Sequence, residues 1–553
     1  MAEPVRVTFL GGLGEIGRNC ACVEVDGRIL LLDVGLMFPE LDMLGVDLVL
    51  PDFTYLRQNA DRVDGAIITH GHEDHMGGLS YLLRELSFPI YGSALTLGLA
   101  RNRIEEAGVL DRTELIAVAD GERRRIGPCD VEFIPVTHSV PHGFATAFHT
   151  PQGTILHSGD FKLDLTPVDG RLTDLARMGQ IAKDGGVRLL LADSTNAEEA
   201  GYSRSETSVG AVLYDLFHAH EGRRIITASF ASHVHRVQQI ADAAMAFDRT
   251  VVTIGMSMKK NVRLARDLGL LNIPDHAIRD IEDVGDLEPG KVCIISTGSQ
   301  GEPMSALALM ASGESRWLKL NADDTVILSS HPIPGNEMNV SKVIDGLVRI
   351  GVEVVHSGIA DVHATGHAKA EELKTLHSVV RPEWFIPVHG EYRHLRAHAR
   401  IGAAMGTPED RILVCEDGDS ILLTDDGIVP TESIPAGYLY VDGIVGDISH
   451  GVLRDRRVLA DEGVVVVVVA IDVVGGSVIT GPEVITRGWI HAAEAEELID
   501  EATEVVRSAV ESALSDGTTD VDGIQKVVRR AAGRFVNQRT KRRPMIVPVV
   551  MEA

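Results

Sequence analysis

The sequence predicts a layered α/β protein of several domains, and three observations lead to this prediction. The chain has 553 residues, whereas a single hydrophobic core stops growing at roughly 250–300 residues, so two or three domains are expected. Short β-branched runs alternate with helical patterns along most of the chain, which is typical of layered α/β folds. Histidine-rich turns near residue 70 return near residue 365. This return indicates that one domain is interrupted by another.

Residues 1–205 are predicted to form the first part of the interrupted domain. Runs such as VRVTFL, ILLLDVG, GAIITH, VEFIPVTH and RLLLADST are separated by Gly/Asp turns and helical patterns. Gly12, Gly14 and Gly17 match a GxGxxG dinucleotide fingerprint. However, the next residues predict two strands joined at Asp26-Gly27, not the helix that would meet a pyrophosphate. We therefore interpret the glycines as a tight turn.

Residues 206–360 predict a second α/β domain inserted into the first, because long helical segments alternate with strands such as RRIITAS, TVVTIG and DTVILSS. This pattern is typical of a parallel sheet. Residues 361–445 then complete the first domain and supply a linker. Residues 446–553 predict a small α/β C-terminal domain. Its run GVVVVVVAIDVV, residues 463–474, is too short to span a membrane and predicts a fully buried strand.

Composition restricts the classes of function. The net charge of −28 argues against a protein that binds polyanions over its whole surface. The five cysteines lack CxxC spacing, so the sequence suggests neither a disulfide framework nor a thiolate zinc site. No apolar run reaches the ~18 residues of a membrane span, and the N-terminus lacks a signal-peptide pattern. We therefore expect a cytoplasmic protein without membrane contact.

The stretch THGHEDHMGG, residues 69–78, carries the strongest chemical signal. It follows the predicted strand GAIIT, at a strand end where α/β sites collect. Its imidazoles and carboxylates suit Zn²⁺ or Mn²⁺. His138, Asp160 and His389 follow or end other predicted strands. Together with the loop they supply enough ligands for two metals, with Asp160 able to bridge, and such a site promotes in-line displacement at phosphorus.

The order and separation of these motifs resemble the hydrolytic motifs of the metallo-β-lactamase fold. HGHEDH, LLDVG, THSVPH and SGDFK carry the likeness, which implies an αββα sandwich. By this resemblance, the first ligand group would comprise His70, His72 and His138, and the second Asp74, His75 and His389. Asp160 would bridge the groups, and Asp33 would support the loop from behind. We expect two divalent metal ions per chain, Zn²⁺ first, with Mn²⁺ or Mg²⁺ as alternatives.

Later motifs are similar to those of the β-CASP nucleases, which insert a domain into the lactamase fold. ADSTN with Asp193, DVHATGHA with His367 and PVHGEYRHL with His389 look like their three extra motifs. With GGLGEIGRN, HPIPGNE and the C-terminal domain, they make nearly the whole chain similar to the bacterial ribonuclease J family. One difference is Thr365, where we expect serine in this family; the hydroxyl is retained.

The resemblance implies a 5′-to-3′ exoribonuclease that acts in mRNA decay and rRNA maturation, with endonucleolytic cleavage as an additional expectation. Asp74, Asp193 and His367 would be catalytic, with His367 protonating the leaving 3′ oxygen or stabilising the transition state. The expected partners are single-stranded RNA with a 5′-monophosphate, further copies of the chain in a homodimer or homotetramer, and other RNA-degradation proteins.

Two loops offer donors for a terminal phosphate. TASFASHVHR leaves a predicted strand and opens a helix, so its side chains and N–H groups can bind phosphate at the helix start. A plain N-cap by Ser232 is the alternative, and Phe230 can either stack on a base or pack in the core. HATGH forms the second loop. The candidate substrate-binding residues are Phe230, Ser232, His233, His363, Thr365 and Gly366.

Other interpretations remain open. A metallo-β-lactamase-fold hydrolase of a small thioester or lactone explains the first 200 residues but gives no role to the inserted domain or His367. A non-catalytic RNA-binding scaffold would have lost its metals, yet no predicted ligand position is missing. Eight basic residues and no acid lie between Lys526 and Arg543. This basic tail predicts either a solvated helix face or a contact with RNA or another subunit.

Overall fold

The computed structural model describes residues 3–40, 42–333, 335–443, 448–490, 492–518 and 520–552. The chain divides into two compact units. The first comprises Met1–Phe38 and Leu48–Leu439, and the second Pro39–Asp47 and Tyr440–Ala553. The predicted boundary at 445/446 lies outside the described residues, as does Pro334 of the HPIPGNE motif. The other predicted domain limits stay predictions.

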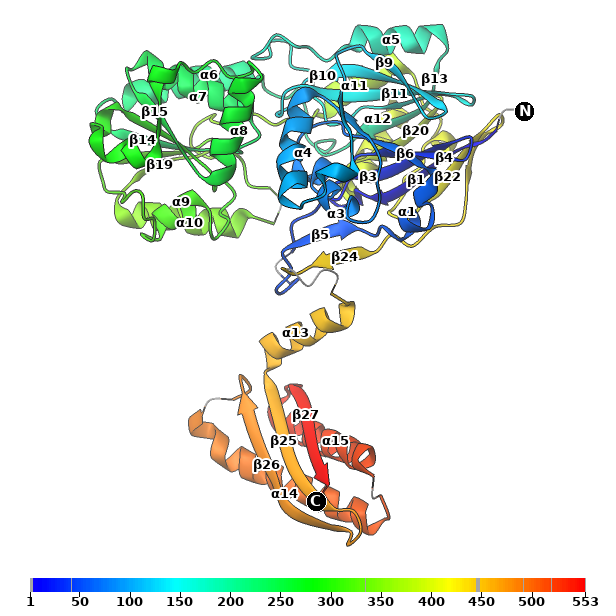
Figure 1. Ribbon diagram of the computed structural model, residues 1–553, viewed down its shortest axis with the longest axis vertical. Helices are drawn as coiled ribbons and strands as arrows, with labels where there is room; N and C mark the ends of the chain where they lie inside the picture. The colour runs from blue at the N-terminus through cyan, green and yellow to red at the C-terminus, as the bar shows by residue number, and fades with distance from the viewer. Residues whose placement is uncertain are drawn as a thin grey trace. The chain divides into compact units, whose positions relative to one another are not determined.

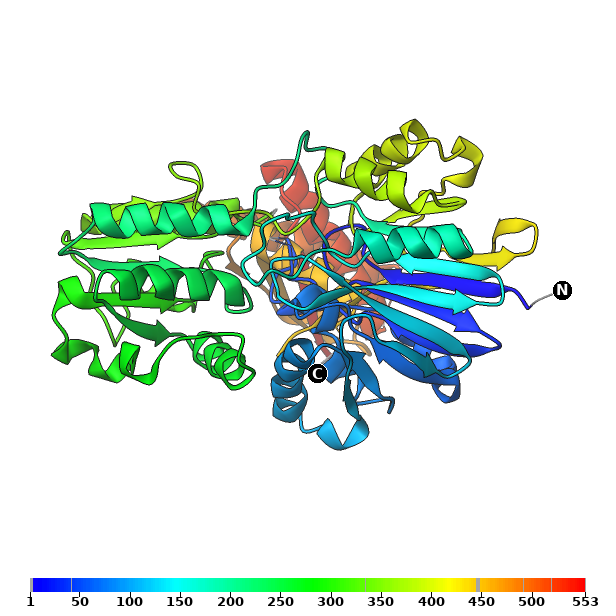
Figure 2. The same cartoon turned by 90° about the horizontal axis from the view of Figure 1, so that it is seen from above.

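Two β-sheets form the centre of the first unit (Figures 1 and 2). The larger sheet has the order β23-β22-β1-β3-β4-β6-β7-β8. Its strands are β1 (Val5–Gly11), β3 (Cys20–Val25), β4 (Arg28–Leu32), β6 (Val63–Ile67), β7 (Ile90–Gly92), β8 (Leu115–Ala117), β22 (Ser420–Thr424) and β23 (Gly427–Pro430). β3 and β4 form an antiparallel hairpin whose turn residues Asp26 and Gly27 both have positive φ, 47° and 72°. The predicted hairpin is confirmed, and no helix follows the glycines of the GxGxxG match.

The second sheet has the order β20-β13-β12-β11-β10-β9. Its strands are β9 (Arg123–Ile126), β10 (Cys129–Val136), β11 (Gly143–Thr150), β12 (Gly153–His157), β13 (Val187–Asp193) and β20 (Trp384–Val388). β13 and β20 are parallel neighbours although the strands that lie between them in the chain belong to another sheet. The chain therefore leaves after β13 and returns with β20, β22 and β23, which confirms the predicted insertion.

Apolar side chains hold the two sheets together and attach helices to their outer faces. One buried cluster joins Val7 and Leu30 of the larger sheet to Phe133 and Leu191 of the second. A further cluster packs the outer face of the second sheet against helices. These helices are α5 (Leu175–Asp184), α11 (Ala370–Val380) and α12 (Tyr392–Ala404). On the other side, α4 (Ala94–Glu106) packs on β7 and β8. The layers are those of the predicted αββα sandwich.

The inserted domain is built on a six-stranded parallel sheet of order β16-β15-β17-β14-β18-β19. Its strands are β14 (Arg224–Ala228), β15 (Thr250–Ile254), β16 (Ile278–Asp280), β17 (Val292–Ser296), β18 (Asp324–Leu328) and β19 (Glu353–Val355). Its helices are α6 (Glu206–Ala219), α7 (Val234–Ala246), α8 (Met256–Asp267), α9 (Ala306–Ala311) and α10 (Glu337–Ile350). Because the strands are parallel, the loops that follow them meet at one edge of the sheet.

The second unit contains a three-stranded sheet of order β26-β25-β27. Its elements are α13 (His450–Glu462), β25 (Val464–Asp472), β26 (Ser477–Arg487), α14 (Ala492–Ser515), α15 (Val521–Thr540) and β27 (Met545–Glu552). One face packs on α14 and α15. Side chains alternate between the faces of a strand, so Val464, Val466 and Val468 point away from these helices and stay half-exposed. The prediction of a fully buried strand was therefore wrong. Among the described helices, none is both long and apolar enough to cross a membrane.

Candidate metal centre

The predicted ligands lie on loops that leave strand ends of both sheets. After β6 the loop reaches His70, and Glu73–Met76 form the single-turn helix α2 that carries Asp74 and His75. His138 follows β10, Asp160 follows β12 and His389 follows β20, all in the second sheet. Glu73 points elsewhere and forms an ion pair with Arg103, at 2.6 Å. The sandwich therefore brings ligands from distant parts of the sequence to one place.

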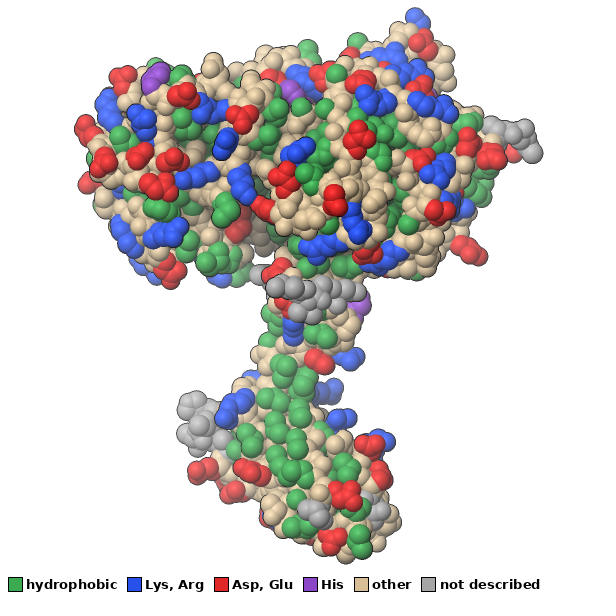
Figure 3. Space-filling view, viewed as in Figure 1, with side chains coloured by type: hydrophobic (Ala, Val, Ile, Leu, Met, Phe, Trp, Pro, Cys, Tyr) green, Lys and Arg blue, Asp and Glu red, His purple; other side chains and the backbone are tan. Residues whose placement is uncertain are grey.

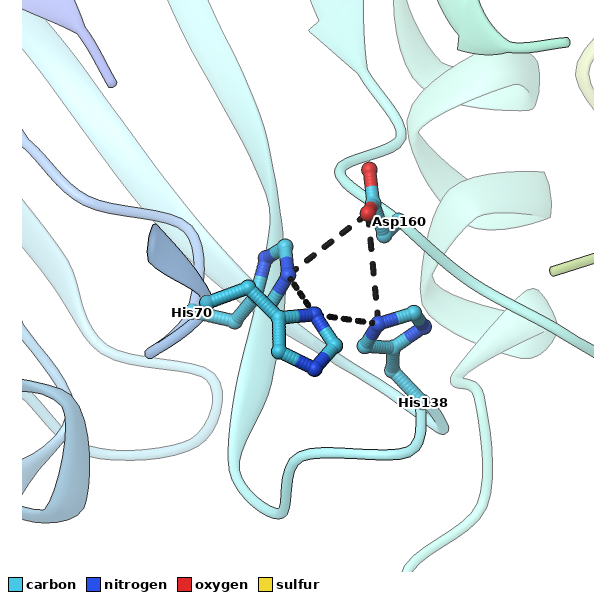
Figure 4. Close-up of side chains that lie close together, drawn as sticks. His70, His138 and Asp160 are labelled. Carbon is cyan, nitrogen blue, oxygen red and sulfur yellow. Dashed lines mark hydrogen bonds and ion pairs between the residues drawn. The ribbon is translucent and has the colours of Figure 1, made fainter. Parts of the chain in front are cut away.

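The first ligand group converges on a single point. His70 Nε2 lies 3.0 Å from His72 Nδ1, and His138 Nε2 lies 3.2 Å from the same atom. Asp160 Oδ2 lies 3.5 Å from His70 Nε2 and 3.9 Å from His138 Nε2. Figure 4 shows the rings of His70 and His138 and the carboxylate of Asp160 facing one another. Three ring nitrogens and a carboxylate oxygen thus face a common centre.

The histidines of this group are held in the neutral form that metal ligation requires. Burial holds the pKa of His70 and of His138 well below the ordinary value. Burial also lowers the pKa of His72 to about 4. His138 Nδ1 donates to the Gly366 carbonyl at 2.8 Å. Because that carbonyl can only accept, Nδ1 carries the proton of His138 and Nε2 keeps its lone pair.

The second ligand group lies beside the first. Asp74 Oδ2 lies 3.5 Å from His75 Nε2 and 3.9 Å from His389 Nε2. Asp160 Oδ2 lies 3.2 Å from His75 Nε2 and 3.4 Å from His389 Nε2. The same carboxylate oxygen thus lies within 4 Å of ring nitrogens in both groups. This position is the one that a bridging ligand needs.

Asp33 lies behind the loop, as the sequence predicts. Its Oδ2 accepts from His75 Nδ1 at 2.8 Å and from Thr69 Oγ1 at 2.9 Å, and its Oδ1 accepts from the Thr69 N–H at 2.8 Å. Burial lowers the pKa of His75, but Asp160, Asp74 and Asp33 outweigh this effect and raise it well above the ordinary value. The carboxylates therefore favour positive charge at this point of the centre.

The donor set fits a divalent metal centre. Within each of two sets, His70, His72, His138 and Asp160, and Asp74, His75 and His389, the ligand atoms lie within 4.8 Å of one another. Imidazole nitrogen and carboxylate oxygen are ligands of Zn²⁺ and Mn²⁺. Buried carboxylates and imidazoles at such short separations are stabilised by a cation at their centre. We conclude that the cluster binds divalent metal.

Asp193 and His367 adjoin this cluster. His367 Nδ1 lies 2.8 Å from Asp193 Oδ2 and 4.0 Å from Asp160 Oδ2. Burial lowers the pKa of His367, but the hydrogen bond and charge of Asp193 outweigh it and raise the pKa to about 9. Together with Asp160 and His389, the pair also forms a third set of close ligand atoms. The structure thus places both predicted catalytic residues next to the metal ligands.

The HATGH loop also borders the centre. The Gly366 carbonyl holds His138, and a Cβ atom at Gly366 would lie 2.6 Å from the His138 ring, so a larger residue does not fit. Thr365 Oγ1 accepts from Asn196 Nδ2 at 2.8 Å and from the His367 N–H at 3.2 Å. Since its oxygen is already used as an acceptor, the Thr365 hydroxyl proton can be donated to a ligand.

The loop after β14 carries Phe230, Ser232 and His233. The N-cap of α7 is His233, and its side chain makes no cap hydrogen bond. The alternative prediction, that Ser232 is a plain N-cap, was therefore wrong. The buried ring of His233 lies 3.3 Å from Glu206 Oε1, and Phe230 is half-buried. Arg236 of α7 donates to the Val362 carbonyl at 2.8 Å. This bond ties the loop after β14 to the segment that leads into HATGH.

Three residues of this region were not predicted from the sequence. Asn19 contacts both Asp74 and His389. Ser229 Oγ is buried without a hydrogen-bond partner in the described part of the chain, as is Nδ1 of His363, a residue that the sequence did predict. Arg236 is fully buried between the two loops. The motifs GGLGEIGRN and TASFASHVHR contain Asn19, Ser229 and Arg236. However, no sequence pattern distinguishes these three residues from the other polar residues of the motifs.

Comparison with protein families covers most of the chain. Residues 13–201 match the metallo-beta-lactamase superfamily, and residues 222–347 match the beta-CASP domain of ribonuclease J. Residues 351–409 match a Zn-dependent metallo-hydrolase RNA specificity domain, and residues 451–553 match the ribonuclease J C-terminal domain. A crystal structure of a protein of unknown function from Enterococcus faecalis V583 covers 76% of this chain, and all of its own chain is covered, with a TM-score of 0.55 and 17% identity. That likeness concerns the fold alone.

Full-length relatives agree with the family matches. Ribonuclease J2 of Bacillus subtilis (strain 168) is 39% identical over 100% of this chain and 99% of its own length. Ribonuclease J of Mycobacterium tuberculosis (strain H37Rv) is 42% identical over 99% of this chain and 97% of its own length. Together with the αββα sandwich, the inserted parallel sheet and the His/Asp cluster, these similarities show that the chain belongs to the ribonuclease J family.

Proposed function

We propose that this chain is a metal-dependent ribonuclease that hydrolyses phosphodiester bonds from the 5′ end of single-stranded RNA bearing a 5′-monophosphate. The observation that carries the proposal is that the candidate phosphate-binding, proton-donating and metal-binding residues meet at one short loop. The same Gly366 that holds the metal-ligand candidate His138 stands between Thr365 and His367. The HATGH loop therefore connects the candidate phosphate donors, the candidate proton donor and the metal cluster in one short segment.

The proposed cofactors are two divalent ions per chain, Zn²⁺ first because the donor set is rich in imidazole, with Mn²⁺ or Mg²⁺ as alternatives. The proposed ligands are His70, His72 and His138 for one ion, Asp74, His75 and His389 for the other, and Asp160 for both. Bound there, such ions supply positive charge that stabilises the attacking and leaving oxygens of an in-line displacement at phosphorus. The side chain of Asp74 is more exposed than that of Asp160, 29% against 3%.

His367 is proposed to transfer a proton to the leaving 3′ oxygen. Asp193 Oδ2 accepts from its Nδ1 at 2.8 Å, which fixes the plane of the ring and leaves Nε2 as the atom that holds the transferable proton. Asp193 is itself held by the N–H and hydroxyl of Thr195, at 3.0 and 2.8 Å. Asp193 thus positions His367, and His367 meets the substrate.

The 5′-phosphate is proposed to bind between the HATGH loop and the loop after β14. Thr365 has a hydroxyl proton to donate, and Ser229 Oγ and His363 Nδ1 lack partners within the described residues. Ser232 and the N–H groups at the start of α7 add further donors, and Phe230 is proposed to stack on a base. His233, already paired with Glu206, contributes through its backbone N–H or after rearrangement of its ring. An unpaired buried donor is costly, and a phosphate oxygen removes that cost.

The biological setting is also part of the proposal. A family member of this kind acts in mRNA decay and in maturation of ribosomal and other RNA, with endonucleolytic cleavage as a second activity, in the cytoplasm. Self-association as a homodimer or homotetramer is supported by the apolar outer face of the C-terminal sheet, visible in Figure 3. Val549 and Met551 of β27 are 38% and 47% exposed there. Other RNA-degradation proteins are the proposed further partners.

One assay tests the proposal against its alternatives. Metal-loaded protein is incubated with RNA that carries either a 5′-monophosphate or a 5′-triphosphate, with and without chelator. We expect chelator-sensitive release of mononucleotides from the monophosphate RNA. Hydrolysis of a thioester or lactone without RNA cleavage would instead indicate a small-molecule hydrolase, and RNA binding without cleavage would indicate a scaffold.

A further inference from the structure

Asn19 lies between the two segments that carry the second ligand group. It is 9% exposed and stands in the loop between β2 (Leu13–Gly14) and β3. Its backbone N–H and its side-chain Nδ2 both donate to the Asp74 carbonyl, at 2.9 and 3.0 Å. Its Oδ1 lies 2.9 Å from His389 Nδ1. One side chain therefore touches the α2 segment and the end of β20 at the same time.

The contacts of Asn19 determine which nitrogen of His389 can bind a metal. The Asp74 carbonyl can only accept a hydrogen bond, so the amide nitrogen of Asn19 must face it. The amide oxygen then faces His389 Nδ1, and because that oxygen can only accept, Nδ1 must carry the proton. His389 Nε2 is left with its lone pair and faces the carboxylate of Asp160 at 3.4 Å. For a neutral imidazole, these contacts therefore select the tautomer that carries its proton on Nδ1.

The arrangement parallels that of His75 and Asp33. Asp33 Oδ2 accepts from His75 Nδ1 at 2.8 Å and leaves Nε2 facing the cluster. Metal-binding histidines commonly donate their other ring N–H to such an oxygen, which fixes both tautomer and ring orientation. Asn19 supplies the corresponding oxygen for His389. Its Nδ2 also lies 3.2 Å from His75 Nε2, so it contacts every member of the second ligand group.

Arg18 holds the backbone next to Asn19 in place. Its guanidinium is 1% exposed, lies 2.6 Å from Glu15 Oε1 and from Asp417 Oδ2, and stacks 4.3 Å from the centre of the Tyr438 ring. A buried arginine with two carboxylate partners has few alternative conformations. Arg18 and His389 both have a positive φ, 49° and 54°, which is uncommon for residues other than glycine. The ion pairs of Arg18 hold this backbone conformation next to Asn19, and Asn19 in turn contacts His389.

We propose that Asn19 is a positioning residue for the second ligand group: it holds His389 in the tautomer and orientation that leave Nε2 available, and it thereby sets the affinity of that group for a divalent ion. The inference rests on the proposed function only in taking these residues as metal ligands. It assigns Asn19 no contact with RNA.

The test measures Zn²⁺ binding to the chelator-stripped full-length protein by competition with a chromophoric chelator. In wild type we expect two bound ions. In Asn19→Ala we expect one ion bound as before and the other weakened about 10- to 100-fold, the usual effect of removing a residue that orients a ligand. The visible absorption spectrum of the Co²⁺-loaded protein should change for that ion alone. Unchanged affinity and spectrum in Asn19→Ala would overturn the inference.

A second variant separates the two contacts of Asn19. Asn19→Asp keeps an oxygen that accepts from His389 Nδ1 but loses the donor to the Asp74 carbonyl. If orientation of His389 is the important role, Asn19→Asp retains most of the Zn²⁺ affinity that Asn19→Ala loses. Equal losses in both variants would contradict the role assigned to the amide oxygen. Because the aspartate is nearly isosteric, it also keeps the test valid if the alanine variant folds poorly.

Controls distinguish this role from general destabilisation. Asn59 makes two side-chain hydrogen bonds in the same unit, to the Tyr55 carbonyl and from Arg62, and lies outside the cluster. Asn59→Ala should therefore leave Zn²⁺ binding unchanged, whereas His389→Ala should lose the same ion that Asn19→Ala weakens. A wild-type chain that binds no Zn²⁺ would overturn the proposed function as well. A wild-type chain that binds two ions, with an unchanged Asn19→Ala variant, would overturn this inference alone.

Discussion

The metal cluster differs in organisation from the two adjoining loops that we propose bind phosphate, HATGH and the loop after β14, called the phosphate loops below. In the cluster, nearly every ring is oriented by another group of the chain: His138 by the Gly366 carbonyl, His75 by Asp33 and His389 by Asn19. In the phosphate loops, Ser229 Oγ and His363 Nδ1 are buried without a partner in the described part of the chain. In the first region the chain itself orients the candidate ligands. In the second region we propose that such unpaired groups bind a phosphate of the substrate.

This difference predicts that mutations in the two regions have effects of different size on RNA turnover. Removing a ligand from the cluster leaves the remaining buried carboxylates and imidazoles without their common partner, so the loss should be nearly complete. Removing one donor from the phosphate loops costs a single hydrogen bond, on the order of 0.5–1.5 kcal/mol. Mutations in the two regions should therefore differ by orders of magnitude in their effects on turnover.

The largest effect is expected at Asp160, whose Oδ2 lies near ring nitrogens of both ligand groups. Asp160→Asn keeps the shape but removes the charge, and we expect kcat to fall about 10³-fold or more, since metal ions contribute several kcal/mol to such reactions. Single-turnover cleavage of 5′-monophosphate RNA measures the loss. Elemental analysis should show fewer than two ions per chain. Retention of both ions with normal turnover would contradict the bridging position.

His367 should produce the next largest effect, because we propose that it acts in proton transfer. We expect His367→Ala to lower kcat about 10²- to 10⁴-fold, the usual range for a general acid, with little change in KM for the RNA. Metal content serves as the control and should stay at the wild-type level. Wild-type turnover in this variant would rule out the proposed role of the Asp193–His367 pair.

Thr365 should give a smaller and more selective effect. Thr365→Val removes the hydroxyl that we propose to donate to the 5′-phosphate, so we expect the preference for monophosphate over 5′-hydroxyl RNA to fall about 3- to 10-fold. Thr365→Ser keeps the hydroxyl and provides the matched control, with wild-type preference expected. If both variants show the wild-type preference, the hydroxyl does not bind the terminal phosphate.

The sequence predicted the parts of the fold that depend on local pattern. The alternation of strands and helices in residues 206–360 was enough to predict the parallel sheet, and the histidine motifs that return late in the chain were enough to predict the insertion. The burial of β25 was not predictable in the same way. A run of valines is compatible with a strand that is buried on one face or on both faces. Which of the two occurs depends on whether helices cover one face of the sheet or both.

The site shows the same limit. His70, His72 and Asp74 could be assigned because metal ligands recur as compact motifs with a chemical reason for their spacing. Asn19 stands some fifty residues before Asp74 and makes its contacts through hydrogen bonds whose direction exists only in three dimensions. Ser229 is recognisable only because its hydroxyl is buried without a partner among the residues that the structure describes. Residues that support a ligand and donors that lack a partner can be identified only in the folded structure, because a local sequence pattern does not indicate them.

The smallest effect is expected in the second unit, in the basic tail. Lys526, Arg530 and Arg534 lie one turn apart on α15 and are exposed, and the described residues place no acidic group within ion-pair distance of them, whereas Arg539 pairs with Glu501 at 2.7 Å. If such cations contact RNA phosphates, replacing the three with glutamine should flatten the dependence of log affinity on log salt by about 2.

For the same variant we expect the KM for long RNA to rise about 3-fold. The kcat on short substrates should stay unchanged, because neither the metal cluster nor the phosphate loops are altered. Replacing Arg454, Arg457 and Arg507, three arginines of the same unit outside the tail, provides a charge-matched control. A salt dependence that is the same in wild type, tail variant and control would exclude RNA contact by the tail. The basic residues would then serve as a solvated helix face, and capture of the substrate would rest on the first unit alone.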